Sequence, residues 1–376
     1  MHILFLNSWY PNRILKQNGD FIQRHAQAVA LQHKVTAFHV KSDPNLKQKI
    51  EITEDEKNGV KTYIAYVKAS KNPVLKAIRF INGYRTLLKK TNNIDVVHVN
   101  KLFPVGVVAL WLKKTKKRPF IITEHHTIYH QPYAKKIGFT ERFLSKLITK
   151  NAAFVAPVSK DLGFAMQKFG LKGKYTNVPN VVDTKRFKAK EKKQEIFTIL
   201  HVSSMNKVKN IDGILKAIKA LEKHISSFQF QMIGGNAEDF MVKAKELGLT
   251  EENLFFKNQV SHQEITKYFQ KASVFLLFSD VENLPCVILE AFSCGTPVIS
   301  TNVGGIAECF PKDFGILIPS KDEDALLKAI LKIYTDFNSV KPEIMHQYVE
   351  EHFSEKQICK AFTKLYKQAL KPFKNT

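Results

Sequence analysis

Two glutamates in the second half of the chain, Glu282 and Glu290, have the residue type and the spacing to bind two parts of one ligand. Pro285 suits the first turn of a helix, which puts Glu282 in the preceding loop and Glu290 inside the helix. Eight helical steps span about 12 Å, which is too far for an acid and a base that act on one bond. The pair suits an elongated ligand with hydroxyls at both ends, such as a sugar nucleotide. Because Glu290 lies in an apolar stretch, its carboxylate needs a polar partner, and ribose hydroxyls would serve.

Strand-like apolar runs alternate with amphipathic stretches along the whole chain. In the first half we expect strands at 2–6, 34–40, 60–66, 95–99, 119–123 and 153–157, and helices near 20–32, 73–90, 104–114, 139–150 and 159–169. In the second half we expect strands at 196–202, 228–233, 253–257, 273–278, 297–300 and 314–318, with helices between them and after them, up to 342–352 and 355–370. This βαβ rhythm predicts two parallel sheets, each covered by helices on both faces.

The charged stretch 184–195 has no periodicity, and we interpret it as a linker between two domains. We therefore expect a first domain at 1–185 and a second at 186–352. The last segment, 353–376, should carry a helix that packs back on the first domain. Ligands of open α/β sheets bind outside the carboxyl ends of the strands, so two such domains suit the transfer of a group between two bound molecules.

The residues around the two glutamates resemble those of a known family. The matching segments, in chain order, are Val158-Ser159, Pro179-Asn180-Val181-Val182-Asp183, Ile233-Gly234-Gly235, Glu282 to Glu290 as an E-x7-E pattern, Gly295-Thr296-Pro297-Val298-Ile299, and Gly304-Gly305 with Glu308. A lone E-x7-E is common by chance, but an ordered set that covers most of the chain is specific. The sequence resembles the family 4 retaining glycosyltransferases, which have the GT-B fold of two Rossmann-like α/β domains facing each other across a cleft.

By this resemblance the second domain binds a nucleoside diphosphate sugar, with a UDP-sugar as the expected donor and no other cofactor. Glu290 would bind the ribose, Glu282 the sugar, and Lys209 the diphosphate, whose negative charge grows as its bond to the sugar breaks. Lys209 and Glu282 are also the expected catalytic residues of this domain. Gly304 and Gly305 would bring backbone amides close to the phosphates or the sugar. No D-x-D or other metal-binding pattern stands out, so we expect no metal site.

One position departs from the family pattern. The family usually has an arginine where this chain has Ser203, six residues before Lys209. Either Lys207 supplies the second positive charge, or the site works with one lysine. Val260, at a strand end, completes the expected donor set. The departure also leaves open a GT-B scaffold that binds a partner without catalysis.

Two features of the first half are expected to reach the active site. Asn18 and Gly19 precede a helix and resemble the family's glycine loop, near the donor phosphates and the acceptor. Thr123-Glu124-His125-His126 ends a strand, where the family commonly has a histidine that contacts the donor sugar. His125 is the better match and is the expected catalytic residue of this half. No carboxylate on this side stands out as a nucleophile, so the resemblance implies front-face displacement with retention.

The formal net charge of +24 comes from the first half, since residues 1–190 hold 35 Lys and Arg against 11 Asp and Glu, and residues 191–376 hold 23 of each. Segments 72–90 and 135–150 combine basic residues with an apolar face, and 113–118 is a cationic run. Such helices suit docking on anionic lipid. We therefore expect an anionic membrane surface as a partner, and a lipid-linked or cell-surface polysaccharide or glycolipid precursor as the acceptor. A basic nucleic-acid-binding protein is the alternative, but no nucleic-acid motif is present and we expect no such partner.

The location of the protein is predicted from its apolar segments and cysteines. No run is long enough to span a membrane, and the apolar start at 2–6 is too short for a signal peptide. The four cysteines lack metal-binding spacing and fit a reducing compartment. We expect a cytoplasmic enzyme that is at most peripheral at the inner face of the cell membrane.

Overall fold

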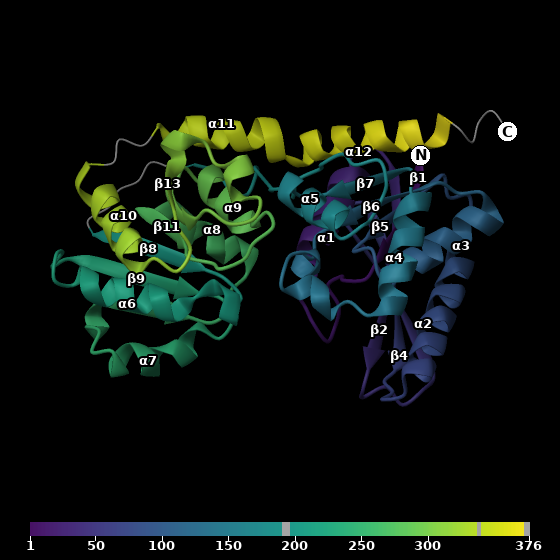
Figure 1. The fold of residues 1–376 in the computed structure, drawn as a ribbon, viewed down its shortest axis with the longest axis horizontal. Helices are drawn as coiled ribbons and strands as arrows, with labels where there is room; N and C mark the ends of the chain where they lie inside the picture. Colours follow the sequence, from purple (N-terminus) through teal and green to yellow (C-terminus); the bar gives the residue numbers. More distant parts are fainter. Residues whose placement is uncertain (190–195, 337–339, 372–376) are drawn as a thin grey trace. The chain divides into compact units, whose positions relative to one another are not determined.

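A computed structural model describes residues 1–189, 196–336 and 340–371, which form two compact units (Figure 1). The first unit runs from Met1 to Val181 and includes the stretch that begins at Glu355. The second unit is Val182–Ser354. The boundaries expected from the sequence, after residues 185 and 352, lie close to these divisions.

The first unit is built on a seven-stranded sheet in the order β3-β4-β2-β1-β5-β6-β7. The strands are β1 (His2–Asn7), β2 (Lys34–Asp43), β3 (Ile50–Lys57), β4 (Val60–Lys68), β5 (Val96–Asn100), β6 (Phe120–Glu124) and β7 (Phe154–Pro157). Its helices are α1 (Asp20–Ala30), α2 (Pro73–Leu87), α3 (Gly106–Lys116), α4 (Phe139–Asn151), α5 (Lys160–Lys168) and α12 (Glu355–Leu370). All six residues of β1 are buried, as expected for a parallel strand covered on both faces.

Strand β3 is absent from the elements expected from sequence. It pairs with β4 in the antiparallel direction at the edge of the sheet, whereas the other neighbouring strands run parallel. Residues 54–57 of β3 are exposed and none of its residues is buried. Four of its eight residues are acidic, so the apolar signal that reveals the buried strands is missing.

Helix α12 belongs to the first unit although it ends the described chain. Ile358, Phe362 and Tyr366 are buried in a cluster with residues of α1 and the sheet. The Tyr366 hydroxyl also hydrogen-bonds Nδ1 of His98 in β5, at 2.7 Å. The core of this unit therefore includes residues from both ends of the sequence.

The second unit has a six-stranded parallel sheet in the order β10-β9-β8-β11-β12-β13. The strands are β8 (Phe197–Val202), β9 (Phe228–Ile233), β10 (Leu254–Lys257), β11 (Val274–Leu277), β12 (Val298–Thr301) and β13 (Gly315–Ile318). The helices are α6 (Ile211–Leu221), α7 (Phe240–Glu246), α8 (His262–Lys271), α9 (Cys286–Ser293), α10 (Glu323–Asp336) and α11 (Pro342–Phe353). When these strands are numbered 1 to 6 along the chain, their order across the sheet is 3-2-1-4-5-6, which is the Rossmann order. The topological switch point therefore lies between β8 and β11.

The segment expected to be a linker is partly folded into the second unit. Phe187 is fully buried, its ring lies 6.1 Å from that of Phe269, and its carbonyl accepts a 2.5 Å hydrogen bond from Oγ of Ser293. The rest of that segment, 190–195, lies outside the described residues.

None of the helices in the described part of the chain has the length and apolar character needed to cross a membrane.

Candidate active site

Lys209 and Glu282 meet at the switch point of the second sheet. Lys209 follows β8 and Glu282 follows β11, and their side chains form an ion pair. The Lys209 side chain is 14% exposed and that of Glu282 is 11% exposed. The backbone N–H of Asp280 donates to the carbonyl of Val208 at 2.7 Å and joins the two loops. Two residues 73 positions apart are thus held together where Rossmann-like sheets bind their ligands.

Ser203 shapes the loop that carries Lys209. Burial lowers the pKa of His201 to about 4, so its ring is neutral. Its Nδ1 lies 2.9 Å from the carbonyl of Leu276, which can only accept, so Nδ1 carries the proton and Nε2 accepts. The Ser203 hydroxyl therefore donates to Nε2, at 2.9 Å, and accepts from the backbone N–H of Met205, at 3.0 Å.

Lys209 stands immediately before the start of helix α6. Asn210 caps this helix, since its side chain accepts from the backbone N–H of Gly213 at 3.2 Å. Lys207, two residues earlier, has an exposed side chain. A positive side chain and a helix N-terminus thus lie close together, which is a favourable arrangement for an anion.

Gly304 and Gly305 support the loop that carries Glu282. Gly304 has φ +58°, and a Cβ at this position would lie 1.9 Å from the carbonyl oxygen of Glu282. The backbone N–H of Gly305 donates to the carbonyl of Asn283 at 2.8 Å. A larger residue at 304 would push the Glu282 loop away.

Glu290 lies in α9 and is only 3% exposed, while Glu282 is in the preceding loop, as the sequence predicts. Pro285 is the residue before the helix rather than part of its first turn. Val260 is half-buried and follows β10, which β9 separates from β8. Among these donor residues, close contacts join Lys209, Glu282 and Gly304.

In the first unit, Gly19 ends the loop between β1 and α1. It has φ +75°, and an added Cβ would lie 2.8 Å from the backbone carbon of Trp9, so only glycine fits without a shift. Asn18 is half-buried, and its backbone N–H donates to the carbonyl of Leu15 at 3.2 Å.

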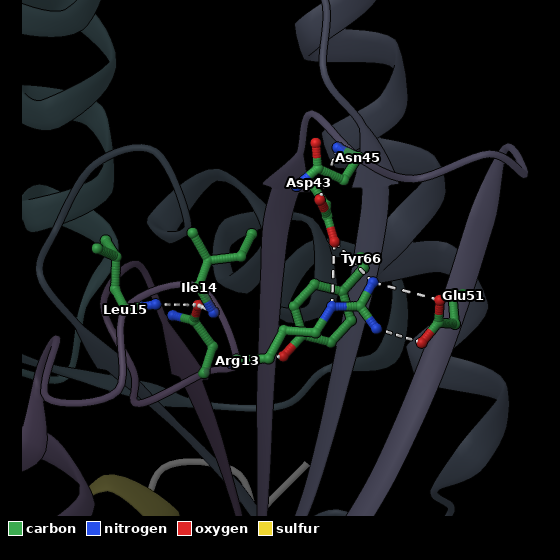
Figure 2. Close-up of polar contacts among 8 residues, drawn as sticks. Arg13, Ile14, Leu15, Asp43, Asn45, Glu51 and Tyr66 are labelled. Carbon is green, nitrogen blue, oxygen red and sulfur yellow. Dashed lines mark hydrogen bonds and ion pairs between the residues drawn. The ribbon is translucent and has the colours of Figure 1, made fainter.

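Arg13 fastens this loop to the edge of the sheet (Figure 2). Its Nη2 lies 2.7 Å from Oδ2 of Asp43 and its Nη1 lies 2.5 Å from Oε1 of Glu51. The guanidinium stacks on the ring of Tyr66 at 3.8 Å, and the Tyr66 hydroxyl accepts from the Arg13 backbone N–H at 3.0 Å. The backbone amides of the next two residues donate to the side chain of Asn12. The loop that precedes Gly19 is thus tied to β2, β3 and β4.

His125 is buried within the first unit, with 8% of its surface exposed. Its ring lies 4.7 Å from that of Phe21 and 5.4 Å from that of His25, and burial holds its pKa well below the ordinary value. His126 is half-buried and packs edge-on against Trp9 at 4.9 Å. Of the two histidines, His126 is the more exposed.

Sequence reasoning did not single out Lys101 and Glu124, which lie beside these histidines. The ammonium of Lys101 lies 4.3 Å from the centre of the Trp9 ring. The carboxylate of Glu124 accepts from the backbone N–H groups of Leu102, His125 and His126 at 2.8 to 2.9 Å. Burial raises the pKa of Glu124, and these hydrogen bonds oppose the rise. The sequence pattern could have indicated both residues, because Lys101 follows β5 and Glu124 ends β6, and the carboxyl ends of these adjacent parallel strands meet at one edge of the sheet.

Within the ranges that the structure describes, no three His, Cys, Asp or Glu side chains group together as metal ligands would.

Family comparisons agree with this architecture. Residues 182–352 match the family model described as "Glycosyl transferases group 1", and residues 21–186 match "Glycosyltransferase Family 4". Two Rossmann-like α/β units with these matches define a glycosyltransferase of the GT-B fold, so the predicted fold class is confirmed. The chain belongs to the family 4 glycosyltransferases, as the resemblance indicated.

Two relatives have names that refer to phosphatidylinositol and to teichuronic acid. A phosphatidylinositol N-acetylglucosaminyltransferase subunit of Arabidopsis thaliana is 26% identical over 76% of this chain and 64% of its own length. The putative teichuronic acid biosynthesis glycosyltransferase TuaC of Bacillus subtilis (strain 168) is 28% identical over 74% of this chain and 71% of its own. The structure of HepE from Anabaena in complex with UDP and glucose superposes with a TM-score of 0.74 at 16% identity, over 97% of this chain and 98% of that one.

Proposed function

We propose that this glycosyltransferase moves a sugar from a nucleoside diphosphate sugar, a UDP-sugar by expectation, to an acceptor hydroxyl with retention of anomeric configuration. The observation that carries the proposal is the Lys209–Glu282 pair at the switch point of the second sheet. Further support comes from HepE, whose structure contains UDP and glucose.

The ion pair has a role in donor binding under this proposal. A diphosphate carries more negative charge than one carboxylate, so it can draw Lys209 away from Glu282. Glu282 is then free to accept hydrogen bonds from the hydroxyls of the donor sugar. Glu290 accepts from the ribose, and the exposed Lys207 is near enough in sequence to add charge. Ser203, at the usual arginine position, keeps the loop folded.

The chemistry is a front-face displacement. The bond between the anomeric carbon and the diphosphate oxygen breaks, and the bond to the acceptor oxygen forms on the same face. The acceptor's proton passes to the departing diphosphate. Lys209 and the N-terminus of α6 stabilise the negative charge that builds on the leaving group. His125, Gly19 and Asn18 are proposed to contribute from the first unit.

The acceptor is proposed to be a lipid-linked or cell-surface polysaccharide or glycolipid precursor. The names of the Arabidopsis and Bacillus relatives, which refer to phosphatidylinositol and teichuronic acid, support this class. The excess of positive charge in residues 1–190 supports docking of the first unit on an anionic membrane surface.

A thermal-shift panel with UDP-, GDP- and ADP-glucose tests the donor assignment. A ligand at a hundred times its dissociation constant stabilises the folded state by about 2.7 kcal/mol, which is easily detected. We expect a shift with the UDP-sugar that is reduced in Glu290→Gln and kept in Glu251→Gln, a surface carboxylate of the same unit. If no sugar nucleotide shifts the wild type, the proposal fails; binding without turnover or hydrolysis would identify a non-catalytic scaffold.

A further inference from the structure

Helix α2 has an apolar face that no described part of the chain covers. Val74 is 63% exposed and Ile78 is 47% exposed, and within α2 only Gly83, Tyr84 and Leu87 are buried. The helix is nonetheless well formed, because Asn72 accepts hydrogen bonds from the first backbone amides. Eight of the seventeen large apolar side chains that are exposed in the described residues belong to α2, α3 and α4. Such clustering marks an interaction surface rather than scattered surface residues.

A groove of about 680 Å³ borders this face, and Ile81 is the large exposed apolar residue of α2 that belongs to both. Its lining includes Phe80 and Ile81 of α2, Val107 and Trp111 of α3, and Leu144 of α4. The three helices form one group in Figure 1. The volume falls in the range of sites that hold a small molecule, and the lining is mainly hydrocarbon and aromatic. Its chemistry therefore fits a flexible apolar chain.

The surroundings of the groove are strongly positive. Residues 68–118, which include α2 and α3, hold thirteen Lys and Arg against one acidic residue, a net charge of +12. Lys76 and Arg85 line the groove itself. No ion pair formed among the described residues involves a member of this segment. Arg79 and Lys113 donate to backbone carbonyls and Lys101 lies over the ring of Trp9, whereas Lys76 and Arg85 are exposed and can bind an external anion.

We propose that the groove between α2, α3 and α4 takes up a hydrocarbon chain of an anionic membrane lipid, while Lys76 and Arg85 bind its headgroup. The inference rests on the proposed function, in which the first unit docks on an anionic membrane, and it assigns the place where a lipid of that membrane is held. An apolar slot and a cationic border match the two parts of such a lipid.

Charge and shape argue against other occupants. A second copy of this chain would bring another segment of +12 against the first. A nucleic acid would satisfy the cations but would leave the apolar slot open to water.

Trp111 offers a direct readout, because the chain has only two tryptophans. Vesicles of phosphatidylglycerol and phosphatidylcholine in equal parts, with bromine atoms on the acyl chains, should quench its fluorescence. The quenching should disappear in Trp111→Phe and should be weak with pure phosphatidylcholine.

A variant with a filled groove distinguishes the insertion of a lipid hydrocarbon chain from general adhesion of the protein to the vesicle surface. Ala77 is exposed and lines the groove, so Ala77→Phe adds apolar surface while occupying the slot. We expect its sedimentation with the anionic vesicles to fall by about tenfold, because lost chain burial outweighs the added ring. The matched control is Leu31→Phe, at a 56% exposed position outside the groove, which should bind as the wild type does.

The inference is overturned if Ala77→Phe binds vesicles as the wild type does, if brominated chains leave Trp111 unquenched, or if sedimentation equilibrium shows a dimer that Ala77→Phe abolishes. Thermal shift by UDP-glucose, read on the same samples, keeps the two proposals apart. If the vesicle tests reject lipid uptake in the groove while UDP-glucose still stabilises the protein, the proposed function stands. Lipid binding without any nucleotide-sugar effect would reject the function and retain the groove.

Discussion

At the scale of single residues, the site of the second unit depends on a half-buried ion pair. Removing one partner of such a pair leaves the other charge poorly solvated, so neither residue can be changed without affecting the other. Lys209 is positioned by the helix start that follows it, and Glu282 by the glycine pair behind its loop. The pair therefore links three segments that are distant in sequence.

Lys209→Ala should lower kcat by about a hundredfold, since removal of one group that stabilises developing charge has an effect of this order. The effect on KM should be smaller. Turnover is measured with the donor identified by thermal shift. Lys245→Ala, which breaks the exposed pair with Glu251 in the same unit, is the control and should keep full activity. Wild-type turnover in Lys209→Ala would show that this lysine does not stabilise the leaving group.

Gly304→Ala should destabilise the second unit and displace Glu282. The added Cβ would lie 1.9 Å from the carbonyl oxygen of Glu282, so the two segments must move apart. In addition, a φ of +58° costs alanine about 1–2 kcal/mol. We expect a lower urea midpoint together with weaker UDP-glucose binding. Gly138→Ala, where an added Cβ meets nothing within 4 Å, is the matched control. Unchanged donor affinity would mean that the position of the loop is irrelevant to binding.

At the scale of elements, most of what could be predicted from the sequence concerns the strands along the chain and the residues at their carboxyl ends. The alternating pattern predicted the parallel strands, and Pro285, although it precedes the helix by one residue, correctly indicated that Glu282 lies in a loop and Glu290 in a helix. The sequence could not reveal β3, which has four acidic residues and no buried one, or the contact between Lys209 and Glu282, which depends on tertiary packing. The role of Ser203 was also hidden, because it follows from the proton position on the buried His201.

The loop between β1 and α1 is expected to loosen in Arg13→Gln. This change removes both carboxylate contacts and the stacking on Tyr66. Hydrogen exchange at residues 12–18 should become faster, while the core strands keep their protection. Lys61→Gln, which removes an exposed pair with Glu54 on the same sheet, should leave the loop unchanged. Equal exchange in Arg13→Gln and the wild type would show that the Arg13 side chain does not hold the loop.

At the scale of the whole molecule, stability should fall as the solution becomes acidic. Burial lowers the pKa of His25, His39 and His201 to about 4, from an ordinary value of 6.5. The unfolded chain therefore binds more protons than the folded chain between these values, and stability is lost as the pH falls through this window. At pH 5 each histidine lowers the free energy of unfolding by about 2 kcal/mol.

Urea unfolding at pH 7 and pH 5 measures this loss, and NMR titration of the histidine rings assigns it. Three rings that remain neutral down to about pH 4 would agree with the burial of these residues. A set of histidines that all titrate near 6.5, with equal stability at both pH values, would contradict it.

The position of α12 has a consequence for how the protein is made. Its buried residues Ile358, Phe362 and Tyr366 complete a core whose first strand begins at His2. On the ribosome, every residue of the second unit emerges before this last helix does. The first unit therefore keeps one flank of its core uncovered until α12 has been synthesised. The later-made half can finish folding first, which reverses the usual order in which nascent domains mature.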